Sequence, residues 1–167
     1  MKLITAIALI LGSATPMATF ASDTAGAPSV MVYASGLNNP RGLKFGPDGD
    51  LYVAEGGVGG SDPAPSTPDC TVPPPVGPYT GSPVGSRISR IDRDGRRTTV
   101  VDNLPSSQTS PALGSLVSGI ADIAFLDEDM YAILAGAGCS HGVPSIPNGV
   151  IHVRRNGSWS MIADPDD

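Results

Sequence analysis

The chain has 167 residues, of which 21 are glycine and 17 are proline. Both residue types destabilise helix interiors, so this composition argues against a helical bundle and favours short strands joined by turns. The formal net charge is −6, which argues against a nucleic-acid partner, because neutralising phosphates requires a basic surface.

The first 21 residues have the pattern of a secretory signal peptide. Lys2 is their only charge, an apolar run covers residues 3–11, and small residues lead to Ala21. The apolar run is too short to span a bilayer, and no second long one follows in the sequence. We therefore expect a signal peptide over 1–21 and an exported mature chain over 22–167, periplasmic or extracellular, with no membrane anchor. The alternative is a buried N-terminal strand or helix.

Residues 30–40 resemble residues 99–105 farther along the chain. In both segments a run rich in apolar residues leads through asparagine and leucine to a proline. Residues 99–101 are expected to lie in the outermost strand of a four-stranded sheet. By analogy, we expect residues 30–34 to form an outer, closing strand without a sheet of its own.

Residues 41–54 predict a β-hairpin. Apolar residues alternate on both sides of a Pro-Asp-Gly-Asp turn at 47–50, which is the pattern of half-buried strands around a tight turn. Residues 121–133 repeat this pattern with one residue deleted at the turn. The repeat matches Leu43 with Ile123, Phe45 with Phe125, and Tyr52 with Tyr131.

A second hairpin follows each of these. Residues 86–101 are strand, Asp-Gly turn and strand, and residues 149–162 repeat the pattern around an Asn-Gly turn. These two dipeptides, flanked by alternating apolar residues, are the strongest short-range hairpin signals. The repeat matches Ile88 with Val150, Ile91 with Val153, and Val100 with Ile162.

Two hairpins followed by two more predict an all-β fold, a partial β-propeller of two four-stranded antiparallel blades. We expect the first blade over about 41–104 and the second over about 119–164. Gly/Pro-rich insertions at 56–84 and 136–148 separate the second and third strands of the two blades. Pro105 is expected to end the first blade, because proline cannot donate to a strand ladder.

Cys70 and Cys139 lie one in each insertion. An even cysteine count in an exported chain suggests a disulfide, and adjacent blades would place both insertions on the same face. A metal site is not expected, because Cys139 and His141 supply only two ligands close together.

Two blades cannot close a propeller ring of four to eight. We therefore expect the chain to be part of a longer propeller. The alternative is self-assembly of several copies, for example three two-bladed chains in a six-bladed ring.

Residues 32–57, 85–91 and 119–125 resemble the ScyD/ScyE family of exported bacterial proteins. The resemblance extends over nearly the whole mature chain. It implies the N-terminal part of a six-bladed propeller similar to NHL-repeat and strictosidine-synthase-like proteins. The resemblance supplies no catalytic residues.

Four residues are candidates for ligand binding. Arg41, Glu55 and Asp122 are expected at the ends of inner strands, where propellers line their central channel, and His141 lies in a Gly-rich loop. The alternatives are solvated or turn-capping charges and a surface histidine. Ser140 and His141 are not expected to form a catalytic pair, because sequence neighbours rarely hold that geometry. The acidic residues Asp48, Asp50, Asp127, Glu128 and Asp129 are assigned to turn chemistry rather than to Ca²⁺.

The sequence holds no convergent catalytic set and therefore favours a non-catalytic binding or scaffold module for a small molecule or a protein. The alternative is a fragment of a metal-dependent hydrolase or lactonase resembling strictosidine synthase and gluconolactonase. Those enzymes draw their metal ligands from several blades. We assign no cofactor to the chain, and Ca²⁺ in the channel of a complete propeller stays open.

Overall fold

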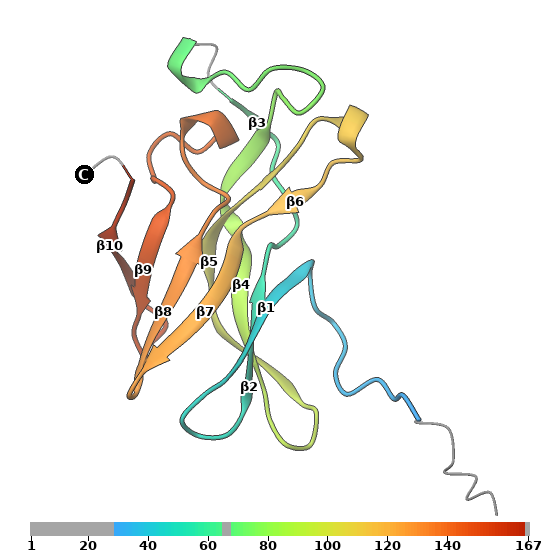
Figure 1. Cartoon of the computed structure of the whole chain (residues 1–167), viewed down its shortest axis with the longest axis vertical. Coiled ribbons are helices and arrows are strands. Elements are labelled where there is room, and N and C mark those ends of the chain that lie inside the picture. Colours follow the sequence, from blue (N-terminus) through green and yellow to red (C-terminus); the bar gives the residue numbers. More distant parts are fainter. Residues whose placement is uncertain (1–28, 65–67, 166–167) are drawn as a thin grey trace, which may run out of the picture. The chain divides into compact units, whose positions relative to one another are not determined.

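The computed structural model describes residues 29–64 and 68–165, so the predicted signal peptide lies outside the described residues. The described chain is all β, with three short 3₁₀ helices, as the sequence predicted (Figure 1). None of its helices is long and apolar enough to cross a membrane. The strands are β1 (Pro40–Phe45), β2 (Leu51–Glu55), β3 (Asp62–Pro63), β4 (Thr80–Ile91), β5 (Arg97–Gln108), β6 (Val117–Ser118), β7 (Ile120–Leu126), β8 (Asp129–Leu134), β9 (Gly149–Val153) and β10 (Trp159–Ala163).

The first sheet has the strand order β1-β2-β4-β5-β6, and β3 pairs with β4. Both predicted hairpins form: Phe45 pairs with Leu51 across the first turn, and Ile91 pairs with Arg97 across the second. Gly95 has a φ of +78° in the second turn, a conformation that glycine adopts without steric cost.

The second sheet has the order β10-β9-β8-β7, so each strand pairs with its neighbour in the chain. Phe125 pairs with Met130 around the first turn, and Val153 pairs with Trp159 around the Asn-Gly turn. The two antiparallel sheets therefore confirm the predicted hairpins of the repeat.

Pro105 does not end its strand, contrary to expectation. The strand β5 continues through it to Gln108, and β6 then extends the first sheet to Ser118, beyond the expected boundary at 104. The reason is a bulge: Leu104 pairs with Ser86 and Ser106 pairs with Ser82, so three residues of β4 face Pro105. The missing N–H of a proline is tolerated at such a register shift.

The expected outer strand over 30–34 does not form, since residues 29–38 belong to no strand. Residues 33–38, here called the strap, instead lie along the first sheet. The Tyr33 hydroxyl donates to the Asp92 carbonyl at 2.8 Å, and the Arg87 guanidinium donates to the Gly36 carbonyl at 2.6 Å. A strand needs a parallel or antiparallel ladder beside it, whereas the strap bonds to side chains, to a turn and, through the Asn38 carbonyl, to the Gly57 N–H.

The hydrophobic core lies between the two sheets, and β1 and β2 contact β7. The alternation of side chains along a strand explains this core, because every second residue of each inner strand points toward the other sheet. Buried members include Ala54, Ile88 and Val101 of the first sheet and Ile123, Met130, Ala132 and Ile151 of the second.

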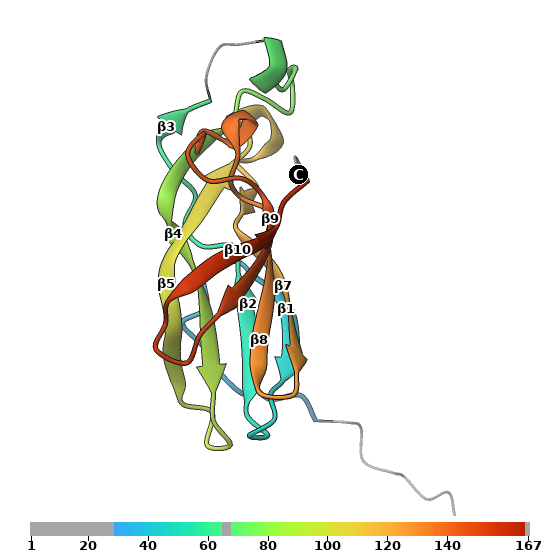
Figure 2. The same cartoon turned by 90° about the vertical axis from the view of Figure 1, so that its left-hand side faces the viewer.

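The two insertions lie at the same end of the sheets, away from the turns of the β1–β2, β4–β5 and β7–β8 hairpins (Figures 1 and 2). Their short helices η1 (Pro68–Cys70) and η3 (Cys139–His141) are joined by the predicted Cys70–Cys139 disulfide, with a Cα–Cα distance of 5.3 Å. Glycine permits the close approach nearby: a Cβ at Gly81 would lie 2.1 Å from the His141 carbonyl oxygen.

Candidate functional site

A pocket of about 500 Å³ lies between the two sheets, near the hairpin turns. Its floor is apolar and its rim is charged, which is the usual composition of a small-ligand site. The floor consists of Tyr52, Val100, Phe125, Met130 and Val153, and the rim carries Asp48, Arg90, Thr98, Thr99, Glu128, Arg154 and Arg155.

An aromatic pair from both sheets forms one wall of this pocket. The rings of Tyr52 and Phe125 meet edge to face, with centroids 5.0 Å apart. The Tyr52 hydroxyl donates to Asp48 Oδ2 at 3.0 Å. Burial raises the pKa of Tyr52 to about 12, and the hydrogen bond to Asp48 adds to the shift. Tyr52 therefore stays a neutral hydrogen-bond donor throughout the physiological pH range.

Two of the three arginines on the rim form ion pairs with carboxylates. The Arg90 guanidinium lies 2.5 Å from Asp50 Oδ2 and 3.2 Å from Asp48 Oδ2. Arg155 forms an ion pair with Glu128 in which both side chains are exposed. These ion pairs neutralise most of the charge on the rim. The paired arginines therefore contribute to the shape of the pocket more than to the attraction of a charged ligand.

Arg154 is the third rim arginine. It is exposed, and its guanidinium donates to Ser160 Oγ at 3.1 Å. It takes part in none of the ion pairs found among the described residues. A guanidinium has five N–H donors, so Arg154 can bind an incoming carboxylate or sulfonate beside the apolar floor.

Glu55, a predicted site residue, is instead enclosed within the first sheet. Its carboxylate accepts hydrogen bonds from Asn38 N, Ser89 Oγ and Arg87 Nε, the last at 2.9 Å. The side chain of Glu55 is 0% exposed, against 18% for Arg87. These contacts satisfy the carboxylate and tie the strap to β2 and β4, which is a structural task.

Arg41 lies on β1 and Asp122 on β7, two strands that contact each other. The exposed Arg41 guanidinium donates to the Val117 carbonyl, and Asp122 Oδ1 accepts from Ile123 N at 2.9 Å. A Cβ at Gly42 would lie 2.2 Å from Asp122 Oδ1, so glycine there lets β1 and β7 meet. Neither residue lines the pocket between the sheets.

His141 lies in the disulfide-linked insertion. Its ring packs on Tyr79, with centroids 4.5 Å apart, and burial lowers its pKa. Its Nδ1 is 3.1 Å from Ser140 Oγ, within hydrogen-bond distance.

The turn acids do not converge on a cation site in the described chain, where no group of three or more His, Cys, Asp or Glu side chains is placed to hold a metal. Asp48 Oδ1 accepts from Asp50 N at 3.2 Å, which is turn chemistry of the predicted kind.

The pocket between the sheets was not identified from the sequence. The sequence signal for this pocket is the alternating pattern of the repeat. It places Tyr52 and Phe125 on one side of their strands and the neighbouring residues on the other. Recognising the site required the packing of one sheet on the other, which hairpin patterns do not specify. Comparison of the chain with protein-family models, characterised proteins and solved structures finds no match.

Proposed function

We propose that the chain is an exported, non-catalytic binding module whose two sheets are consecutive blades of a propeller of the ScyD/ScyE type. Three observations support this proposal. The two sheets share a strand order and a repeat, the disulfide suits an oxidising compartment, and residues 32–57 carry the family-like motif.

The pocket between the sheets is the proposed binding site. The observation that carries this assignment is the combination of an apolar floor with one arginine outside the ion pairs, Arg154, on a pocket of about 500 Å³. This combination favours a small amphipathic anion, with an aromatic or aliphatic body on Tyr52 and Phe125 and an acidic group on Arg154.

The test is a calorimetric titration of the mature chain with 2-naphthoate and with 2-naphthol, which share a ring system and differ in charge. We expect 2-naphthoate to bind up to about fivefold more tightly, because an ion pair at an exposed arginine is worth up to about 1 kcal/mol. Arg154→Ala should remove this difference, and the exposed Arg96→Ala, outside the pocket, should leave it unchanged.

Equal affinity for the two probes, or equal effects of the two arginine substitutions, would contradict the anion site. Turnover of a lactone by the same preparation would contradict the non-catalytic assignment.

A further inference from the structure

The two sheets each turn one apolar face away from the other. On the first sheet this face, here the first outer face, exposes Leu43 and Phe45 of β1 to 60% and 71%. On the second sheet the corresponding second outer face exposes Leu126 to 66% and Ile133 to 48%, with Tyr131 between them on the same side of the sheet. Exposed apolar clusters of this kind are typical of contact surfaces.

The repeat relates these outer faces to the faces that pack in the interior. Leu43 and Phe45 are the repeat partners of Ile123 and Phe125, and Ile123 is only 3% exposed in the core. Ile133 is the repeat partner of Ala54, which is fully buried. At these positions the first outer face repeats the core-facing side of the second sheet, and the second outer face repeats the core-facing side of the first. The equivalence stops at Glu55, whose repeat partner is the buried core residue Leu134.

Polar side chains follow the same repeat. In the first sheet Tyr52 stands beside the Arg90–Asp50 ion pair, on the wall of the pocket. In the second sheet Tyr131 stacks on His152, with centroids 5.2 Å apart, and His152 Nε2 lies 3.2 Å from Asp129 Oδ1. The second outer face thus repeats this wall of the pocket, but among residues 29–64 and 68–165 Tyr131 has no aromatic partner equivalent to Phe125.

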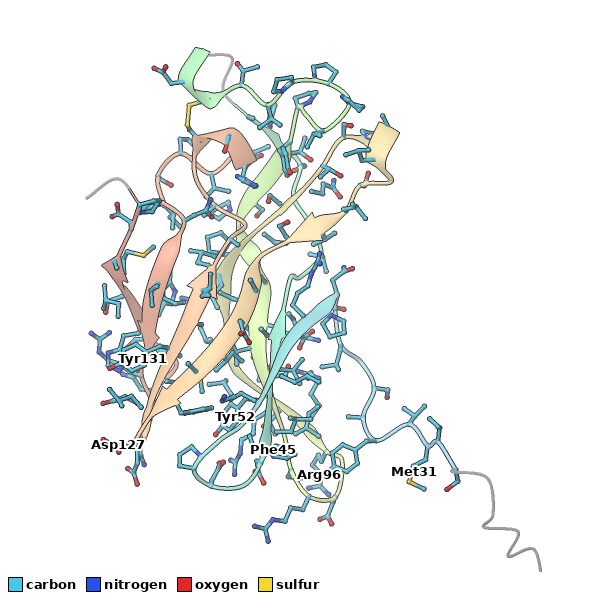
Figure 3. All side chains as sticks on the ribbon, in the orientation of Figure 1. Met31, Phe45, Tyr52, Arg96, Asp127 and Tyr131 are labelled. Atoms are coloured by element: carbon cyan, nitrogen blue, oxygen red, sulfur yellow. A yellow bond between two sulfur atoms is a disulfide. The ribbon has the colours of Figure 1, made fainter. Side chains whose placement is uncertain are left out.

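The missing partner is present on the first outer face, as Phe45. Figure 3 shows Tyr131 and Phe45 on either side of Tyr52, carried by different sheets. One copy of the chain cannot bring its own Phe45 and Tyr131 together, because the interior interface separates them.

We propose that a second copy of this chain covers these faces, with the first outer face of one copy packed on the second outer face of the next. Phe45 of one copy would then meet Tyr131 of its neighbour as Phe125 meets Tyr52 within the chain. Such a contact is heterologous, so it continues head to tail and gives a ring where the rotation closes, or an open filament where it does not.

The strap covers part of the first outer face, because it bonds there to Glu55 and Arg87. Leu43 and Phe45, on the β1 side of the same face, stay exposed and are the part left for a partner. The argument for a second copy, rather than another protein, is that the faces are repeat equivalents of an interface the chain already forms.

Size-exclusion chromatography with light scattering on the mature chain, without any ligand, tests the proposal. The wild type should elute at a multiple of the protomer mass, and Phe45→Asp and Ile133→Asp should each be monomeric. An equimolar mixture of the two variants should form a dimer and nothing larger, because each variant keeps one intact face. Leu116→Asp, at an exposed apolar residue outside both faces, should assemble as the wild type does.

A wild type that is monomeric at every concentration would overturn the proposal, and so would an assembly that survives Phe45→Asp. A mixture that stays monomeric would also overturn it, because the contact would not be heterologous. Circular dichroism checks the fold of each variant, and Leu43→Asp and Leu126→Asp replace any that fails to fold. The outcome is independent of naphthoate binding, so this proposal and the proposed function can fail separately.

Discussion

Tyr52 and Phe125 come from different sheets, and their rings meet at 70° with centroids 5.0 Å apart. This contact joins the two sheets and also forms a wall of the pocket between them. The stability of the sheet pair and the shape of the proposed binding site therefore depend on the same two side chains.

A double-mutant cycle should measure this contact. We expect Tyr52→Leu and Phe125→Leu to show a coupling free energy of about 1 kcal/mol, the usual value of an edge-to-face pair beyond its burial. Urea unfolding of the wild type, both single variants and the double variant gives the value. Tyr52→Phe, which removes only the bond to Asp48, separates the hydroxyl from the ring, and additive effects of the two leucine substitutions would show that the rings do not interact.

Glu55→Gln should destabilise the fold strongly. Removing the charge leaves the largely buried Arg87 guanidinium without its partner, at a cost of about 3 kcal/mol. The matched control is Glu128→Gln, which breaks the exposed pair with Arg155 and should cost roughly 0.5 kcal/mol or less. Similar losses in the two variants, measured by urea unfolding, would contradict the structural role of Glu55.

Removing the disulfide should lower stability while leaving the pocket intact. Cys70 and Cys139 are separated by 69 residues, and closing a loop of that length stabilises by roughly 4 kcal/mol in the chain-entropy model. We expect the double serine variant to lose up to this amount in urea unfolding and to match the wild type under reducing conditions. A variant as stable as the oxidised wild type would contradict the bridge.

His141 should make the fold sensitive to acid. Burial lowers its pKa from the ordinary 6.5, so the unfolded chain takes up a proton first as the pH falls. The contribution of His141 to the free energy of unfolding is therefore complete above about pH 6.5 and declines below that pH. The His141→Phe variant keeps an aromatic ring against Tyr79 but cannot take up a proton there. Its free energy of unfolding should therefore fall less than that of the wild type between about pH 7.5 and about pH 5. Parallel losses in denaturant titrations would show that His141 carries no such dependence.

The strands were predictable because local patterns specify them. Asp94-Gly95 and Asn156-Gly157 each mark a tight turn, and alternation on either side fixes the register of both hairpins. Pro105 was misread because its tolerance depends on a bulge in the partner strand β4, which the sequence around Pro105 does not reveal. The expected strand at 30–34 failed for a similar reason, since strand formation depends on a partner and not only on apolar alternation.

The candidate site was harder to predict than the fold. Arg41 donates to the Val117 carbonyl and Asp122 accepts from Ile123 N, while Glu55 is held by Arg87 and Ser89 on the first sheet. A charged residue at a strand end looks the same in sequence whether its partner is a ligand or another side chain. The pocket depends on which sheet faces meet, and that is a tertiary property.

The most direct test of the binding site uses the methionine methyl groups. The expected mature chain contains Met31, Met130 and Met161, of which Met130 lies in the pocket floor and Met31 is exposed. In a ¹³C-methyl NMR titration with 2-naphthoate, the Met130 signal should move most, because an aromatic ring settles beside it, and Arg154→Ala should weaken that response. Movement of Met31 or Met161 with an unchanged Met130 signal would contradict a binding site between the two sheets.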